Sequence, residues 1–281
     1  MALEKSGDIL RNAYKNKTAV IAFNVLNYEM IRLAVQKAEE IQKPILIACY
    51  PGFKDMIAIE AVAEITKVCA KNVKIPVGLH LDHCTDYNEL VQAMYMGYSS
   101  VMYDGSMLPF DENVNNTAEV VKVAQALGID VEAELGHVGS AAQASDFSNS
   151  AKFTSPEDAE LFFERTGCSS LAVAVGNAHG RYVQTPNLDL DRIEKISKRL
   201  NIPLVLHGGS GIPDEQVKEA VKRGIAKMNV GTEYFHTFYN SLETRVMSGK
   251  NPKDMLDSAA QIRADVLSYL ENKISLPANP F

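Results

Sequence analysis

Eight short apolar segments, each followed by an amphipathic stretch of helical period, constrain the fold of this chain more than any other feature. They span Ala19–Val25, Ile45–Tyr50, Val77–Asp82, Ser100–Asp104, Ile129–Leu135, Leu171–Gly176, Leu204–His207 and Ala226–Val230. Nearly continuous apolar strands separated by helices are typical of a parallel sheet that helices cover. Eight such units in 281 residues predict an α/β fold, a TIM (β/α)8 barrel forming one domain over residues 1–281. An open doubly wound sheet is the alternative, but it rarely needs eight evenly spaced units.

Helical patterns fill the intervals between these strands and extend beyond them. They cover Tyr28–Ile41, Met56–Ala70, Tyr87–Met96, Asn113–Leu127, Pro156–Thr166, Asp189–Leu200 and Asp214–Arg223, and a further helical segment, Pro252–Lys273, follows the eighth strand. The first 17 residues are polar with a helical pattern, so they are not read as a signal peptide. An Ala/Ser-rich segment, residues 137–155, is typical of a loop that closes over an active site.

Charge and composition exclude several classes of protein. The net charge is −7, and no basic block of the kind that binds nucleic acid is present. No apolar run approaches the roughly 20 residues that span a bilayer. The four cysteines are scattered without a CxxC pair, which favours a reducing compartment over a disulfide framework. We therefore expect a cytoplasmic protein that binds neither nucleic acid nor membrane.

Polar and titratable residues gather at the expected carboxyl ends of the strands. They are Asn24, Asp82, His83, Asp104, Glu134, His179, His207 and Asn229. Catalytic groups of a TIM barrel lie on that face, because the loops that follow the strands form the mouth of the barrel. A single histidine at a strand end is usually only hydrogen-bonded, whereas a convergent set indicates a shared site.

Three imidazoles with an open position are typical of a catalytic zinc site, although iron, cobalt or nickel would also suit them. Asp82 and His83 are adjacent, so both reach the site only if the strand ends there and the chain turns. His83 would then bind the metal while Asp82 carries a proton. Asp104 and Glu134 would surround the ligands or form an alternative metal position. His80 is expected to be structural, His236 has no evident partner, and His137 lies near the mouth, where it could contact substrate.

A glycine-rich loop after the seventh strand predicts an anion site. Gly208, Gly209, Ser210 and Gly211 would let backbone N–H groups approach a phosphate, with Asn229, Val230, Gly231 and Thr232 forming the opposite wall. The loops after strands seven and eight are the usual phosphate site of this fold.

Taken together, these segments resemble the class II, metal-dependent aldolases of the fructose-/tagatose-bisphosphate type. The matching segments run in order: AFNV (22–25), LHLDH (79–83), VMYDGS (101–106), EAELG (132–136), AHG (178–180), HGGSG (207–211) and NVGT (229–232). Each is short, but the ordered set is specific, and weaker likeness extends to the C-terminus.

The resemblance implies a role for each matching residue. His83, His179 and His207 would bind Zn²⁺, and Asp82 would transfer the proton of the hydroxyl at carbon 4. Asn24 would contact the substrate. The backbone around Gly180, residues 208–211 and residues 229–232 would hold the dihydroxyacetone-phosphate end, with a monovalent cation (Na⁺ or K⁺) nearby. A Schiff-base mechanism is second, because its clearest candidate, Lys227, lies inside the eighth strand.

Several residues depart from the family pattern. Tyr50 stands where relatives have a serine that holds the distal phosphate, and Met107 replaces a common histidine. Gly231 is closer to the tagatose-bisphosphate branch. Arg263 resembles an arginine that a neighbouring subunit contributes, which together with the resemblance implies a homodimer or homotetramer. The segment at 139–146, GSAAQASD, lacks the family's loop glutamate, so Asp146 or His137 would have to replace it.

The sequence therefore predicts a zinc-dependent aldolase that acts on a ketose 1-phosphate or bisphosphate. Two alternatives remain. The same constellation could serve a metal-dependent sugar-phosphate epimerase or isomerase, and the missing loop glutamate would also suit a non-catalytic sugar-phosphate-binding protein.

Overall fold

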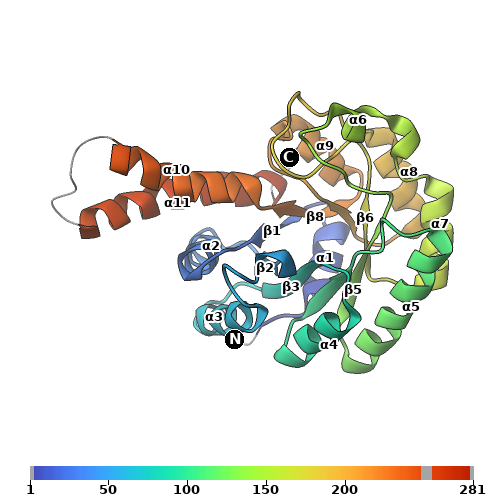
Figure 1. The fold of residues 1–281 in the computed structure, drawn as a ribbon, viewed down its shortest axis with the longest axis horizontal. Helices are drawn as coiled ribbons and strands as arrows, with labels where there is room; N and C mark the ends of the chain where they lie inside the picture. Colours follow the sequence, from blue (N-terminus) through green and yellow to red (C-terminus); the bar gives the residue numbers. More distant parts are fainter. Residues whose placement is uncertain (1–2, 248–254, 279–281) are drawn as a thin grey trace.

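A closed barrel of eight parallel strands, ordered as in the sequence, forms the centre of the molecule (Figure 1). The computed structural model describes residues 3–247 and 255–278. The strands are β1 (Val20–Asn24), β2 (Ile45–Cys49), β3 (Val77–Cys84), β4 (Ser100–Tyr103), β5 (Asp130–Leu135), β6 (Ser170–Val173), β7 (Leu204–Leu206) and β8 (Ile225–Val230). The predicted TIM barrel is confirmed.

Helices follow the strands along the chain, and most of them surround the barrel. They are α1 (Ser6–Lys15), α2 (Tyr28–Glu40), α3 (Ile59–Ala70), α4 (Tyr87–Met96), α5 (Phe110–Leu127), α7 (Pro156–Thr166), α8 (Leu190–Leu200), α9 (Asp214–Lys222), α10 (Thr232–Met247) and α11 (Met255–Ala278), with short turns η1 (Pro51–Phe53), α6 (Ala144–Ser148) and η2 (Ser150–Lys152). The patterns at 87–96 and 156–166 match α4 and α7 to the residue. The first three residues of the expected helix 252–273 lie outside the described residues.

Alternation along the strands divides the barrel into an inner and an outer face. On β3 and β5 the polar residues His80, Asp82, Glu132 and Glu134 occupy alternate positions, so they share the inner face. Apolar residues at the odd positions of these strands belong to the core between barrel and helices. At the amino end, α1 closes the barrel with a separate apolar cluster, formed by Ile9, Leu10, Ala13, Val20, Ala22, Leu46, Ala48 and Ala226.

Two differences from the predicted elements affect the site. The third strand does not end at Asp82 as expected but continues to Cys84, which pairs with Tyr103 of β4 beyond an irregular register between Leu81 and Cys84. The sixth strand ends at Val173, before the expected end at Gly176, and His179 lies in the loop that follows it. The Ala/Ser-rich segment also contains α6 and η2, which the sequence did not indicate.

Helices α10 and α11 lie side by side and project away from the barrel as a paired arm (Figure 1). The end of α11 returns to the barrel, where the Ala19 amide donates to the Pro277 carbonyl at 2.8 Å. Lys273 of α11 forms an ion pair with Glu233 of α10 at 2.6 Å. None of the helices in the described part of the chain has the length and apolar character needed to cross a membrane.

Candidate active site

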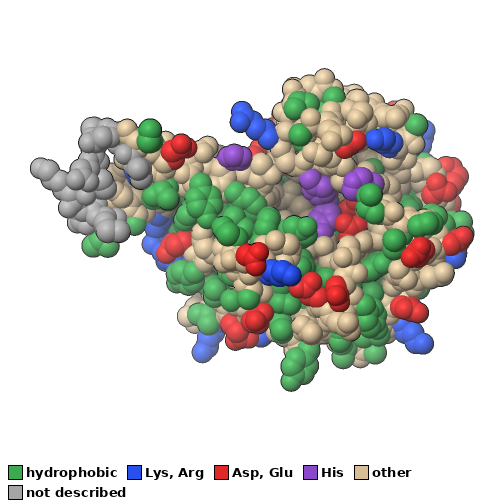
Figure 2. Space-filling view, viewed as in Figure 1, with side chains coloured by type: hydrophobic (Ala, Val, Ile, Leu, Met, Phe, Trp, Pro, Cys, Tyr) green, Lys and Arg blue, Asp and Glu red, His purple; other side chains and the backbone are tan. Residues whose placement is uncertain are grey.

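A cavity of about 460 Å³ opens at the carboxyl ends of the strands. Figure 2 shows histidine side chains gathered around this hollow. Its lining residues are Asn24, Tyr50, Phe53, Asp82, His83, Thr85, Asp104, Glu134, His137, Val138, His179, Gly180, Gly208, Ser210, Asn229, Gly231, Thr232 and Phe235. Most of the residues predicted from the strand ends therefore share one cavity.

A backbone irregularity in β3 turns His83 toward the cavity. Its neighbour Asp82 lies on the inner face, so regular alternation would send His83 outward. Instead His83 has a φ of 46°, in the left-handed region, within the irregular register between Leu81 and Cys84. Bulges of this kind re-aim side chains beside active sites. The expectation that the strand must end for both residues to reach the site was wrong, because the bulge achieves the same result within the strand.

The three histidines predicted to bind metal form a compact cluster. Ring centroids of His83 lie 4.8 Å from His179 and 4.5 Å from His207, and His179 lies 5.6 Å from His207. The Nε2 atom of His83 and the Nδ1 atom of His207 are 2.7 Å apart. Together with a Glu134 carboxylate oxygen, one nitrogen from each ring falls in a group whose atoms are all within 4.8 Å of one another.

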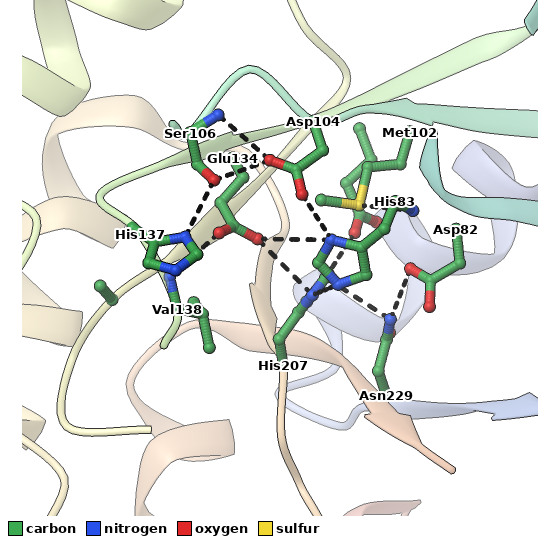
Figure 3. Close-up of polar contacts among 12 residues, drawn as sticks. Asp82, His83, Met102, Asp104, Ser106, Glu134, His137, Val138, His207 and Asn229 are labelled. Carbon is green, nitrogen blue, oxygen red and sulfur yellow. Dashed lines mark hydrogen bonds and ion pairs between the residues drawn. The ribbon is translucent and has the colours of Figure 1, made fainter. Parts of the chain in front are cut away.

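Two of these rings turn their other nitrogen to a carboxylate. His83 Nδ1 lies 2.8 Å from Asp104 Oδ2 (Figure 3). His207 Nε2 lies 2.9 Å from Glu132 Oε1. Such pairs fix the tautomer and orientation of metal-binding imidazoles and raise their basicity. Glu132 was not among the predicted site residues. The available signal was its position two residues before Glu134, which places both carboxylates on one face of β5.

A fully buried lysine balances the charge of Glu132. Lys227 Nζ lies 2.9 and 2.7 Å from the two Glu132 carboxylate oxygens and donates to His80 Nε2 at 3.0 Å. His80 in turn contacts Ser100 Oγ through Nδ1 at 2.7 Å, which suits the structural role expected of it. The Lys227 ammonium fills the space between these groups, so they do not form a second metal site. The same burial keeps this amine from a substrate carbonyl, against a Schiff-base role.

Glu134 has one carboxyl oxygen that makes no hydrogen bond. Its Oε1 atom accepts from the Val138 amide at 3.1 Å, whereas Oε2 is a buried acceptor without a hydrogen bond. Burial raises the pKa of this carboxyl to about 8, although the charge on His83 lowers it in part. Oε2 lies 3.7 Å from His207 Nδ1 and 4.0 Å from His83 Nδ1, contacts that are ion pairs only when the imidazole is protonated. Because a buried carboxyl oxygen without a hydrogen bond is costly, this oxygen facing the imidazole cluster fits a cation bound there.

Asp82 is held by two side-chain amides on opposite sides. Asn24 donates to Asp82 Oδ2 at 2.8 Å and Asn229 donates to Oδ1 at 2.9 Å. Burial favours the neutral carboxyl, but the positive charges at His83, His207 and Lys227 outweigh it and hold the pKa of Asp82 below its usual range. An oriented, ionised carboxylate therefore lines the cavity next to the histidine cluster.

The residues predicted to bind phosphate divide into two sets. Gly180, Gly208, Ser210, Gly231 and Thr232 line the cavity. Gly209, Gly211 and Val230 lie behind this lining. Their backbone groups are used within the protein: the Gly209 amide donates to the Asn229 carbonyl at 3.1 Å, the Gly211 amide to Glu233 Oε1 at 2.7 Å, and Val230 belongs to β8.

Of the residues discussed as departures from the family pattern, some line the cavity and others lie outside it. Tyr50 lines the cavity, with its ring edge-on to His83 at a centroid distance of 6.3 Å. Met107 is exposed and does not line it. Arg263, on α11, donates to Gln36 at 2.6 Å and lies outside the cavity of its own chain. His236 borders an adjoining cavity together with Gly180 and Ser210.

The Ala/Ser-rich segment is bonded to the loop that carries His179. The His179 amide donates to the Gly139 carbonyl and the Ala141 amide donates to the His179 carbonyl, both at 2.8 Å. Asp146 accepts from the Ser140 amide at 3.0 Å and from Lys152 at 3.1 Å. Both oxygens of Asp146 are thus used within the segment, and Asp146 does not line the cavity.

Fold and site together define a TIM-barrel protein with a histidine-rich candidate metal centre at the carboxyl mouth. Residues 4–277 match the model of the family "Fructose-bisphosphate aldolase class-II". A sulfofructosephosphate aldolase from Alkalicoccus urumqiensis is 37% identical over 275 residues, which cover 98% of this chain and 96% of that protein.

Solved structures agree with this assignment. The YdjI aldolase from Escherichia coli K12 has a TM-score of 0.88 and 32% identity, covering 100% of this chain and 98% of the other. A putative fructose-1,6-biphosphate aldolase from Coccidioides immitis has a TM-score of 0.82 and 26% identity, covering 97% and 96%. The chain belongs to the class II fructose-bisphosphate aldolase family, as the resemblance in sequence predicted.

Proposed function

We propose that this chain catalyses the reversible, zinc-dependent aldol cleavage of a ketose 1-phosphate or ketose bisphosphate, releasing dihydroxyacetone phosphate and an aldehyde. The observation that carries the proposal is the convergence of three imidazoles and the buried Glu134 carboxyl group beside the ionised Asp82. Membership of the aldolase family agrees with this chemistry.

In this proposal His83, His179 and His207 hold the metal, with Glu134 as a further or alternate ligand. Asp104 and Glu132 support it, because each accepts a hydrogen bond from the outer nitrogen of one histidine. The donor set of imidazoles and a carboxylate is one that zinc favours. A bound Zn²⁺ would supply a Lewis acid that polarises the substrate ketone and stabilises negative charge left by carbon–carbon cleavage.

Asp82 transfers the proton of the hydroxyl at carbon 4. Cleavage requires that this proton leave while the bond between carbons 3 and 4 breaks, so that the outer fragment departs as an aldehyde. The amides of Asn24 and Asn229 aim the Asp82 carboxylate and keep it ionised, as a proton acceptor must be. Asn24 also lines the cavity, where it can contact the substrate.

The phosphate end of the substrate lies against Gly180, Gly208, Ser210 and Thr232. Thr232 begins α10, whose N-terminus carries a positive partial charge that favours an anion. Since no Lys or Arg lines the cavity within residues 3–247 and 255–278, backbone groups and this helix dipole bind the phosphate. A monovalent cation (Na⁺ or K⁺) beside Gly180 and Gly208 would add the missing positive charge.

The far end of the substrate lies toward Tyr50 and Phe53, which form an aromatic wall. A phosphate or sulfonate there needs a cation that the cavity of one chain does not supply. Arg263 of a second copy would supply it, which is why we propose a homodimer or homotetramer. Because one relative is named a sulfofructosephosphate aldolase, we propose a sulfonated ketose phosphate as the first substrate to test.

A substrate panel tests the proposal directly. The zinc-loaded protein is incubated with sulfofructose 1-phosphate, fructose 1,6-bisphosphate, tagatose 1,6-bisphosphate and fructose 1-phosphate, and both products are identified by mass spectrometry. We expect dihydroxyacetone phosphate plus one aldehyde, and no activity after chelation. Consumption of sugar phosphate without dihydroxyacetone phosphate would favour an epimerase or isomerase. Phosphate-dependent thermal stabilisation without any turnover would favour a binding protein.

A further inference from the structure

Aldol chemistry requires two proton transfers, and Asp82 carries only one of them in the proposed function. The assignment of the second transfer rests on that proposed function. Cleavage removes a proton from the carbon-4 hydroxyl, which is the role of Asp82, and then adds a proton to the carbanion left at carbon 3. In the condensation direction the second step is reversed, and a base removes a proton from carbon 3 of dihydroxyacetone phosphate.

Few titratable side chains in the cavity remain for this second step. The histidine cluster and Glu134 form the candidate metal site. Asp104 accepts from His83 Nδ1 at 2.8 Å, from the Ser106 amide at 3.1 Å and from Ser106 Oγ at 2.7 Å. Asp146 lies outside the cavity lining. The remaining candidates in the lining are His137 and Tyr50.

The contact of His137 with Ser106 determines which ring nitrogen carries the proton. Ser106 Oγ donates its hydrogen to Asp104 Oδ1, so toward His137 it acts as an acceptor. His137 Nδ1 lies 3.4 Å from Ser106 Oγ and would therefore carry the hydrogen. In neutral imidazole the other nitrogen, Nε2, then holds a lone pair and is free to act as a base. Contacts of catalytic groups are often long before substrate binds.

His137 and Asp82 lie on opposite sides of the histidine cluster (Figure 3). His137 follows β5. Asp82 belongs to β3 and accepts hydrogen bonds from side chains of β1 and β8. A ketone bound at the cluster would have its two reacting positions between these groups, so each can serve one proton transfer without competing with the other.

We propose that His137 is the catalytic acid and base at carbon 3, with Ser106 and Asp104 as positioning residues. In condensation, the carbon–hydrogen bond breaks, the proton moves to Nε2, and the electron pair stays on the substrate as an enediolate. In cleavage, the carbon–carbon bond breaks, its electron pair stays at carbon 3, and Nε2 returns a proton to that carbon. His137 regains or releases its proton through solvent, to which its side chain is exposed.

Deuterium exchange into dihydroxyacetone phosphate isolates this step, because it needs neither an aldehyde nor Asp82. The zinc-loaded protein is incubated with dihydroxyacetone phosphate in D₂O, and loss of the carbon-3 proton signal is followed by NMR. We expect exchange by the unaltered protein, and a decrease of about 10²–10⁴-fold in His137→Asn, the usual contribution of a general base. Zinc content and dihydroxyacetone phosphate affinity, measured by metal analysis and calorimetry, should change little.

Further variants make the assignment specific. Asp82→Asn should keep the exchange while losing cleavage, and Asp146→Asn should change the exchange by less than about twofold, because a surface change outside the site costs little. Ser106→Ala should slow the exchange less than His137→Asn does, and Ser106→Thr, which keeps the hydroxyl group, should restore most of it. Exchange at the unaltered rate in His137→Asn would overturn the inference, as would its loss in Tyr50→Phe or Asp146→Asn alone. Absence of exchange in the unaltered protein would instead contradict the proposed function.

Discussion

Replacing Glu132 with Gln should lower both the zinc affinity and the free energy of unfolding. The two effects arise from two different contacts of this side chain, so they can be measured separately. One carboxylate oxygen of Glu132 lies 2.9 Å from His207 Nε2. The same carboxylate is the ion-pair partner of Lys227, at 2.7 Å. All three side chains are at most 2% exposed, so neither contact can be replaced by water without rearrangement.

The expected magnitudes differ for the two contacts. Loss of the carboxylate partner of a metal-binding histidine typically reduces metal affinity about 10- to 100-fold. Loss of one partner of a buried ion pair typically lowers the free energy of unfolding by about 3–5 kcal/mol, because the remaining charge is left uncompensated. We therefore expect Glu132→Gln to lower both the zinc affinity and the stability, and Lys227→Met to lower mainly the stability.

The double variant Glu132→Gln/Lys227→Met separates the two effects. It leaves no buried charge at this position, and methionine fills a volume similar to that of lysine, so most of the lost stability should return. His207 still faces an amide instead of a carboxylate, so the zinc affinity should stay low. Unfolding of the metal-free protein in urea and competition with a chromophoric chelator measure the two quantities. Recovery of zinc affinity in the double variant would refute the reasoning.

Asp104→Asn is the matched control on the other histidine. Asp104 accepts from His83 at 2.8 Å, but its side chain is 19% exposed and has no buried lysine partner. We expect its replacement to lower the zinc affinity about 10-fold or more while the stability of the metal-free protein changes by less than about 1 kcal/mol.

Three other measurements test the structure. Asp82→Asn should retain zinc, measured by metal analysis, and lose at least about 10²-fold in turnover in a retro-aldol assay, because the proton acceptor is gone. Folding lowers the pKa of His80 from 6.5 to about 3, mainly because the side chain is buried and also because Lys227 is close. The unfolded chain therefore binds a proton that the folded protein does not, and the stability falls as the pH falls below 6.5. Between pH 7 and pH 5 this group should cost about 2 kcal/mol, and urea unfolding of His80→Gln should show a pH dependence smaller by that amount. Gly208→Ala should lower the free energy of unfolding more than Gly180→Ala does, by about 1–3 kcal/mol. Both glycines have positive φ, but only at Gly208 would the added Cβ atom meet a carbonyl oxygen, at 1.9 Å. Equal losses in urea unfolding would contradict the placement of the loop.

Local periodicity was enough to predict the architecture and the face that carries the site. The hydrophobic pattern of neighbouring residues indicates each strand and helix, and the presence of eight strand–helix units indicates a closed barrel. Because all eight strands are parallel, their carboxyl ends meet at one mouth. The convergence of Asp82, His83, Glu134, His179 and Asn229 there could therefore be predicted without a known structure.

Contacts between distant strands could not be predicted in the same way. The pairs His207–Glu132 and Lys227–Glu132 join residues 75 and 95 positions apart, and a strand pattern does not specify which inner side chains meet. The left-handed backbone of His83 depends on an irregular register between β3 and β4. Asp146 and Arg263 were candidates by position alone, and packing directs both to partners outside the cavity of this chain.

The sequence by itself thus determined the eightfold barrel and the chemical groups at its mouth, because both depend on residue type and short-range spacing. The tertiary structure decided how those groups are oriented. It sets which imidazole nitrogen faces the cluster, which carboxylate stays ionised and which carboxyl oxygen makes no hydrogen bond. The physical reason is that orientation, charge compensation and burial depend on side chains that the chain brings together only when the barrel closes.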